Sequence, residues 1–131
     1  MSDFPEVALS VRQPWAWAII HAGKDIENRN WREGKLLSHR GRIAVHAAKG
    51  MTWAEYVSAT EFMRRNGIDY PGFHALARGG IIGSVEVFGF VDWSPSRWFT
   101  GPHGLMLRDP MPCPFIPSRG MLGYFHWTES Q

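Results

Sequence analysis

The stretch LSVRQPWAWAIIHAGKDIENR, residues 9–29, decides the fold. It begins with apolar residues that are typical of a strand. Pro14 then suits the first turn of a helix, because its missing N–H would find no partner there in any case. The apolar residues after Pro14 are good helix formers, and Gly23 suits the left-handed position at which a helix ends. The stretch therefore predicts a strand, a tight turn, a short helix and a second strand.

The charged residues at the end of this stretch follow directly on the predicted helix. We expect Lys24 at an exposed helix end, where an ammonium favours the negative end of the helix dipole. In a regular strand Lys24 and Glu27 would point to opposite faces. A turn or bulge after Gly23 would instead bring them together. The sequence leaves both arrangements open, and it also leaves open whether Lys24 is a simple helix cap or a functional lysine.

The remaining segments predict a small barrel of short strands with helices at its rim. Thr52 and Glu55 have the spacing of a capping box, and apolar residues recur behind them at helical spacing until Asn66. Prolines between residues 109 and 118 predict an extended backbone that cannot be a central strand. The expected elements are strands over residues 6–11, 25–31, 41–47, 80–93, 103–108 and 120–127, helices over 14–22 and 52–66, and loops over 32–40 and 94–102.

Length and composition describe one domain. The chain has 131 residues, of which 44% are hydrophobic, and a core over about residues 6–128 is expected. It has no run of about twenty apolar residues and no secretory leader, so we expect a cytoplasmic domain that does not enter a membrane. The single cysteine, Cys113, excludes an internal disulfide. The histidines lack metal-ligand spacing, and we expect neither a metal nor a cofactor.

The charge is small in total but unevenly distributed. The net charge is +2, yet the segment from Arg12 to Lys49 holds eight basic and three acidic residues and carries +5. A basic segment within a near-neutral protein indicates a local anion site, although a solvated basic face would have the same composition. Seven tryptophans add possible platforms for stacking unpaired bases.

Four blocks of the sequence together resemble the ASCH domains of the PUA-like superfamily. The first block runs from Arg12-Gln13-Pro14-Trp15 to Gly23-Lys24, Glu27 and Arg29, and the others are residues 42–49, 83–87 and 119–123. The resemblance covers about residues 8–127. It implies a single ASCH-like domain of α+β class, with a small mixed or antiparallel PUA-like β-barrel and two or three flanking helices. It also implies a basic cleft for RNA, or for a single-stranded or modified nucleotide.

This cleft would combine cations for phosphates with groups for a base. The residues expected to bind nucleic acid are Arg12, Gln13, Trp15, Lys24, Arg29, Trp31, Arg42, His46, Lys49, His103 and Arg119. Glu27 could pair with Lys24 or Arg29, or accept a hydrogen bond from a base edge. His46 lies on a predicted core strand, where a histidine is as readily a structural residue as a ligand.

An enzymatic alternative uses the same cleft. ASCH-like enzymes that remove an acyl group from modified cytidine are similar in having a lysine at the position of Lys24 and a glutamate at about Glu86. They have a threonine where this chain has Glu27. A metal-independent hydrolase of RNA or of a modified nucleoside would use Lys24, Glu27 and Glu86 as catalytic residues, and their closeness around a pocket would favour it. A third reading is a protein-interaction domain, and the sequence fixes neither the ligand nor the oligomeric state.

Overall fold

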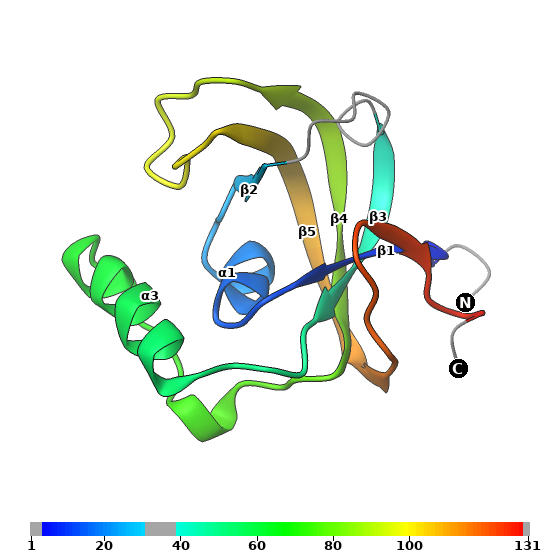
Figure 1. The fold of residues 1–131 in the computed structure, drawn as a ribbon, viewed down its shortest axis with the longest axis horizontal. Coiled ribbons are helices and arrows are strands. Elements are labelled where there is room, and N and C mark those ends of the chain that lie inside the picture. The colour runs from blue at the N-terminus through cyan, green and yellow to red at the C-terminus, as the bar shows by residue number, and fades with distance from the viewer. Residues whose placement is uncertain (1–3, 31–38, 130–131) are drawn as a thin grey trace.

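A computed structural model describes residues 4–30 and 39–129 as one curled sheet with two α-helices (Figure 1). The sheet order is β2-β5-β4-β3-β1-β6, and the strands curve into a half-barrel. In chain order the strands are β1 (Val7–Val11), β2 (Ile26–Arg29), β3 (Gly41–Ala47), β4 (Gly80–Val91), β5 (His103–Pro117) and β6 (Tyr124–His126). The helical elements are α1 (Trp15–His21), α3 (Trp53–Arg65) and a short 3₁₀ turn, η1 (Phe73–Ala75).

The sheet is mixed, because β1 and β3 run parallel while the other neighbouring strands pair antiparallel. This arrangement confirms the mixed barrel-like sheet with flanking helices that was expected from the sequence. Within residues 4–30 and 39–129, no helix is long and apolar enough to cross a membrane.

Helix α1 fills the hollow of the curled sheet (Figure 1). Its buried side chains Ala16, Ile19 and Ile20 pack against the inner faces of the central strands, whereas Ala18 packs toward α3. The helix ends as predicted, because Gly23 adopts the left-handed conformation with φ 73°. The Lys24 backbone N–H then donates to the Ala18 carbonyl, with a donor–acceptor distance of 3.1 Å. Strand pairing begins only at Ile26, so Lys24 lies in a turn and not in β2.

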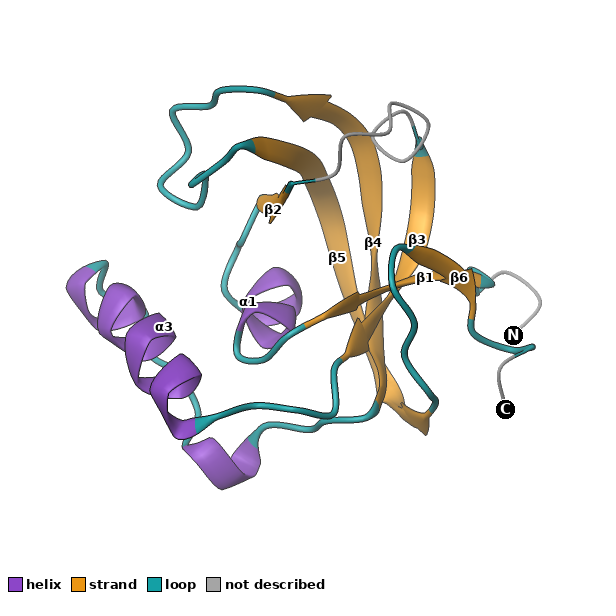
Figure 2. Cartoon of the chain, in the orientation of Figure 1, coloured by secondary structure: helices purple, strands orange, loops and turns teal. Residues whose placement is uncertain are grey.

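Helix α3 lies beyond α1, away from the sheet (Figure 2). The predicted capping box is confirmed: the Glu55 N–H donates to Thr52 Oγ1 at 3.1 Å, and the Thr52 N–H donates to Glu55 Oε1 at 2.8 Å. Met63 on this helix is completely buried, in a cluster that includes Ala18, Ile26 and Trp98. Tyr56 in the first half of the helix is buried in a second apolar cluster with Met51, Leu76 and Trp17, so α3 packs on the core along its length.

The largest difference from the predicted strands concerns β5, which continues to Pro117 where an end at residue 108 was expected. Strand β2 pairs only with His103–Met106, so among the described residues no strand covers the other edge of the later part of β5. Pro110, Pro112 and Pro114 alternate along the strand, which places their ring nitrogens on the same side. That side faces this edge, where no N–H is needed. The prolines therefore mark an edge, as the sequence indicated, without ending the strand.

Candidate nucleic-acid interface

Three adjoining pockets form one groove beside β1, β2 and α1. We name them the aromatic pocket, of about 360 Å³, the middle pocket, of about 510 Å³, and the basic pocket, of about 690 Å³. The aromatic and middle pockets share Trp15, Glu27 and Asn28. The middle and basic pockets share Ser10, Arg12 and Arg29. Because each pocket shares lining residues with the next, the three lie side by side along one face of the molecule.

The walls of the aromatic pocket come from three separate parts of the chain. Trp15 begins α1, Phe62 belongs to α3, and Trp98 lies in the β4–β5 loop. The ring centroids of Trp15 and Trp98 are 6.3 Å apart with the planes at 89°, and Phe62 lies 5.3 Å from Trp98. Edge-to-face contacts of this kind hold aromatic rings in fixed orientations. The result is a pocket with preorganised apolar walls, sized for a small planar group.

Lys24 is buried in this pocket, which corrects the expectation of an exposed helix end. Its exposed fraction is 5%. Its Nζ donates to the Ile26 carbonyl at 2.6 Å and lies 5.3 Å and 5.6 Å from the ring centroids of Trp15 and Trp98. The reason is the turn at Gly23, which directs the lysine inward. Burial lowers the pKa of Lys24 below its ordinary value, and the neighbouring Glu27 opposes this effect.

Glu27 lies between two cations at the junction of the aromatic and middle pockets. Its Oε1 is 3.9 Å from Lys24 Nζ, and its Oε2 is 3.1 Å from Arg29 Nη2. Arg29 also donates to the Ser10 carbonyl at 2.8 Å, which fixes it against β1. Of the two arrangements that the sequence left open, the structure has the one in which a turn brings Lys24 and Glu27 together. One carboxylate compensates two cations, so the cluster keeps an excess positive charge.

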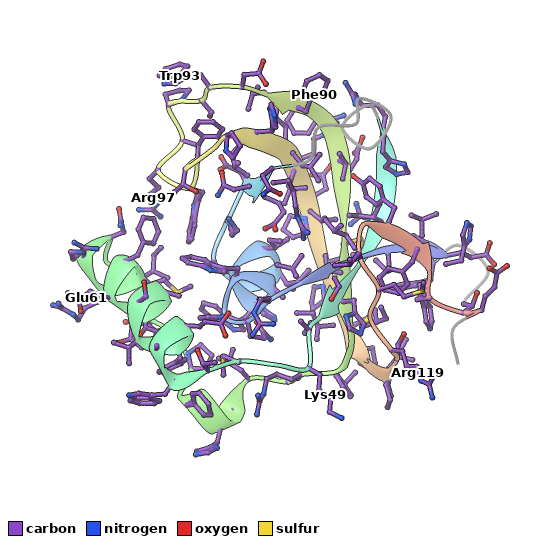
Figure 3. All side chains as sticks on the ribbon, viewed as in Figure 1. Lys49, Glu61, Phe90, Trp93, Arg97 and Arg119 are labelled. Atoms are coloured by element: carbon purple, nitrogen blue, oxygen red, sulfur yellow. The ribbon has the colours of Figure 1, made fainter. Side chains whose placement is uncertain are left out.

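Arg12 contributes to the middle and basic pockets and is held by α3. Its Nη2 donates to Glu55 Oε1 at 2.7 Å, and its Nε lies 2.5 Å from Glu55 Oε2. These two hydrogen bonds, and one from the Thr52 N–H, lower the pKa of Glu55 to about 2. Lys49 and Arg119 line the basic pocket as well, and Figure 3 shows both at the same side of the molecule. The basic pocket thus gathers cations from the end of β2, from the segments that follow β1 and β3, and from the β5–β6 loop.

Two residues that were expected to contact a ligand have structural partners, and one of them, His46, also lines the basic pocket. Gln13 is 2% exposed, its amide nitrogen donates to the Ala77 carbonyl, and its amide oxygen accepts from the Trp17 N–H, each at 2.8 Å. His46 is 1% exposed, and its Nε2 lies 2.7 Å from the Ser118 carbonyl. A carbonyl only accepts, so Nε2 carries the proton. Both side chains fasten distant segments to the core.

Glu86 and Arg42 lie on the outer face of the sheet, apart from the groove. Val85 and Val87 beside Glu86 are buried in the core, so Glu86 points the other way, and it pairs with Arg108 at 3.0 Å. Arg42 donates to Ser84 Oγ at 3.1 Å and to the Asp109 carbonyl. The structure therefore does not bring Lys24 and Glu86 together around a pocket.

Of the remaining predicted residues, His103 lies at the rim of the groove. Its Nδ1 is 2.8 Å from Asp92 Oδ1, and the preceding Gly101 and Pro102 line the middle pocket. Trp31 falls outside the described residues. In the part of the chain that the structure describes, no three His, Cys, Asp or Glu side chains gather closely enough to hold a metal ion.

Sequence reasoning missed the residues that complete the aromatic pocket, namely Asn28, Phe62, Arg65, Arg97 and Trp98. Asn28 donates to the Trp98 carbonyl at 2.9 Å and accepts from the Thr100 N–H at 2.8 Å, so it holds the β4–β5 loop in place. The sequence signal for this loop was weak: Arg97 stands next to Trp98 in a segment that is bounded by Pro95 and Pro102. The helical spacing around Phe62 indicated core packing alone.

Comparison with known proteins identifies the family. No curated protein shows significant sequence similarity to this chain. The ASCH domain family matches residues 9–125, which include every strand from β2 to β5 and both helices. ASCH domains have a PUA-like α+β fold and are generally associated with RNA binding. Because the match covers most of the chain and the observed half-barrel agrees with it, the chain belongs to the ASCH domain family.

Proposed function

We propose that this ASCH domain binds an unpaired RNA nucleotide in the groove, with the base in the aromatic pocket and the phosphates along the basic pocket. One observation carries the proposal: a pocket walled by Trp15, Phe62 and Trp98 adjoins, through shared lining residues, two further pockets that are lined by a cluster of cations. Single-strand binding proteins combine these two features, because bases stack on aromatic rings while a basic groove follows the backbone.

The polar groups of the aromatic pocket suit the edge of a base. Lys24 Nζ donates one of its three N–H groups to the Ile26 carbonyl, and two N–H groups remain for a ligand. Glu27 Oε1 lies 3.9 Å from it, beyond hydrogen-bond distance, and is an acceptor. A nucleobase edge presents a donor and an acceptor side by side, so it can meet both groups at once. Because these groups are buried, a base that leaves them unpaired should bind poorly.

The cations of the basic pocket suit phosphates. Lys49 and Arg119 are exposed and reach this pocket from two segments that are far apart in the sequence. Arg12 presents a guanidinium whose orientation is fixed by Glu55, and a planar fork of this kind recognises phosphate oxygens. Phosphate contacts give affinity that is independent of sequence, whereas the base contacts give selectivity.

The test is a fluorescence anisotropy titration of a labelled single-stranded RNA at several salt concentrations. The logarithm of the affinity should fall linearly with the logarithm of the salt concentration, with a slope of about −0.7 per neutralised phosphate. The variant Lys49→Ala/Arg119→Ala should reduce this slope by about 1.4. Arg108→Ala removes a cation from the outer face and is the matched control, expected to change nothing. A slope near zero in the parent protein would overturn the proposal.

A hydrolase is a second candidate, favoured by one specific observation. Lys24 is buried, its pKa is lowered, and it lies in a pocket beside Glu27, a combination that is frequent in active sites. Lys24 and Glu27 would then form the acid–base couple, without Glu86. Incubation with a small-RNA pool and with modified nucleosides, followed by mass spectrometry, should detect products. Products that persist with Lys24→Arg would exclude Lys24 as the base, since arginine does not lose its proton near neutral pH.

A further inference from the structure

Two apolar side chains stand exposed at the end of the basic pocket. Met121 is 57% exposed and Leu122 is completely exposed, and both line the basic pocket together with Arg12, Lys49 and Arg119. Scattered exposed apolar residues are ordinary. An adjacent pair at the tip of a loop, surrounded by cations that a ligand is proposed to contact, is different because the ligand would meet both kinds of group together.

The loop that carries this pair is anchored by buried residues. His46 Nε2 donates to the Ser118 carbonyl at 2.7 Å, and the Ser118 N–H donates to the Gly79 carbonyl at 3.1 Å. Gly120 is packed so tightly that an added Cβ would lie 2.8 Å from His46 Cε1. A residue larger than glycine does not fit there without displacing the ring. The backbone next to the two apolar side chains is thus held in place, although the side chains themselves do not pack into the core.

We propose that Met121 and Leu122 form an apolar wedge that opens a base step of a base-paired RNA stem beside the unpaired nucleotide. This inference rests on the proposed function and names its substrate class: a stem that carries an unpaired nucleotide. Proteins that unstack nucleic acid insert Leu, Met, Ile, Phe or Pro between bases while basic side chains hold the flanking phosphates. Lys49 and Arg119 are placed for that second task.

The groove supplies the path from the wedge to the aromatic pocket. The wedge lines the basic pocket, which shares Arg12 and Arg29 with the middle pocket, and the middle pocket shares Trp15 with the aromatic pocket. A nucleotide that is displaced at the wedge would therefore pass two cations before its base reaches the rings. Enzymes and binding proteins that extrude a base use such a pocket to compensate the lost stacking. The positive surroundings of the wedge favour a polyanion over a neutral protein surface.

The experiment compares two RNAs, a hairpin with one bulged 2-aminopurine and a linear strand with the same 2-aminopurine and flanking bases. The parent protein should bind the hairpin and raise its 2-aminopurine fluorescence, because the neighbouring bases unstack. Leu122→Ser should weaken hairpin binding by roughly tenfold, a modest share of the cost of opening a base step. Its affinity for the linear strand should stay within about twofold. Met111→Ser is the matched control, since Met111 is 58% exposed on β5 and lines none of the three pockets.

The outcomes separate the wedge from the proposed function. If the parent binds the linear strand but not the hairpin, or if Leu122→Ser weakens both equally, the wedge is wrong and the single-strand proposal stands. If the parent binds neither RNA, both fail. Phosphatidylserine vesicles provide a second arm: if Leu122→Ser abolishes vesicle binding and leaves the hairpin affinity unchanged, the loop contacts lipid and the wedge is overturned.

Discussion

The ion pair between Arg12 and Glu55 predicts a specific dependence of stability on pH. The pKa of Glu55 falls from 4.5 to about 2, chiefly through the hydrogen bond from Arg12 and then through that from the Thr52 N–H. A carboxyl whose folded-state pKa lies below its unfolded value stabilises the fold above the unfolded pKa. The contribution of Glu55 is therefore complete above about pH 5 and is lost as the pH falls from 4.5 toward 2.

The magnitude must be discounted because the pair is exposed. At about 1.36 kcal/mol per pKa unit, the shift would correspond to about 3 kcal/mol for a group shielded from water. The Glu55 side chain is 36% exposed and that of Arg12 is 51% exposed, and such pairs contribute up to about 1 kcal/mol. We therefore expect Glu55→Gln to cost about 1 kcal/mol at pH 7, which lowers the Tm by about 4 °C for a domain of this size. Glutamine keeps an acceptor for the Thr52 N–H, whereas its amide NH2 cannot accept the hydrogen bond from Arg12 Nε, so the substitution removes the charge and that hydrogen bond together.

The assay is urea denaturation of the parent and of Glu55→Gln, followed by tryptophan fluorescence at pH 7 and pH 2.5. At pH 2.5 most of the difference between the two proteins should be lost, because the Glu55 carboxyl is then largely protonated in the unfolded state. Glu61→Gln is the matched control, because Glu61 pairs with Arg64 in the same helix and is more exposed, at 47%. Its effect should stay below about 0.5 kcal/mol. An equal difference between parent and Glu55→Gln at both pH values would refute the reasoning.

Three further outcomes are expected. Thr52→Ala should lower the free energy of unfolding by about 1 kcal/mol in a denaturant titration, because it removes the cap of α3, and it should leave the RNA affinity unchanged. Loss of RNA affinity in a variant that still folds would show that the groove is not the binding site. Burial lowers the pKa of Lys24, so the unfolded state holds this proton more tightly. Stability of the parent relative to Lys24→Met should therefore rise as the pH increases toward 10.5, and a falling difference would contradict the burial. Gly120→Ala should lower the free energy of unfolding by about 1–3 kcal/mol, because the added methyl group would collide with His46. An unchanged Tm would show that the loop moves to accommodate the methyl group.

The local signals in the sequence predicted local structure well. The capping box of α3 and the glycine that ends α1 involve residues within one turn of each other, so their chemistry is visible in a short window. Strand β5 shows the limit of that reasoning. Its prolines exclude a hydrogen-bonded neighbouring strand on one edge only. Whether a strand would have to pair at that edge depends on how far β2 extends. Strand β2 lies about 75 residues before β5 in the chain, so a rule about single residues does not include it.

The site was predictable in its charges but not in its walls. The basic residues between Arg12 and Lys49 are close in sequence, so their excess was visible at once. Phe62 and Trp98 reach the pocket from α3 and from the β4–β5 loop, and nothing near either residue indicates the other. The burial of Lys24 depends on Trp98, and for that reason the sequence indicated an exposed lysine. The resemblance to ASCH domains directed attention to this lysine, whereas its surroundings required the fold.

The burial of Lys24 also determines how a nucleotide would lie in the groove. A phosphate is strongly hydrated, and in the aromatic pocket it would lose that water and meet the Glu27 carboxylate, which lies 3.9 Å from the Lys24 ammonium. A base is planar and neutral, can stack on Trp15 or Trp98, and can hydrogen-bond to both charged groups through its edge. Lys49 and Arg119 are exposed to water and have no such carboxylate in the lining of their pocket. We therefore expect the base at the α3 end and the phosphates at the end near β6, and an RNA with an abasic site at the bound position should keep its salt dependence while losing most of its affinity.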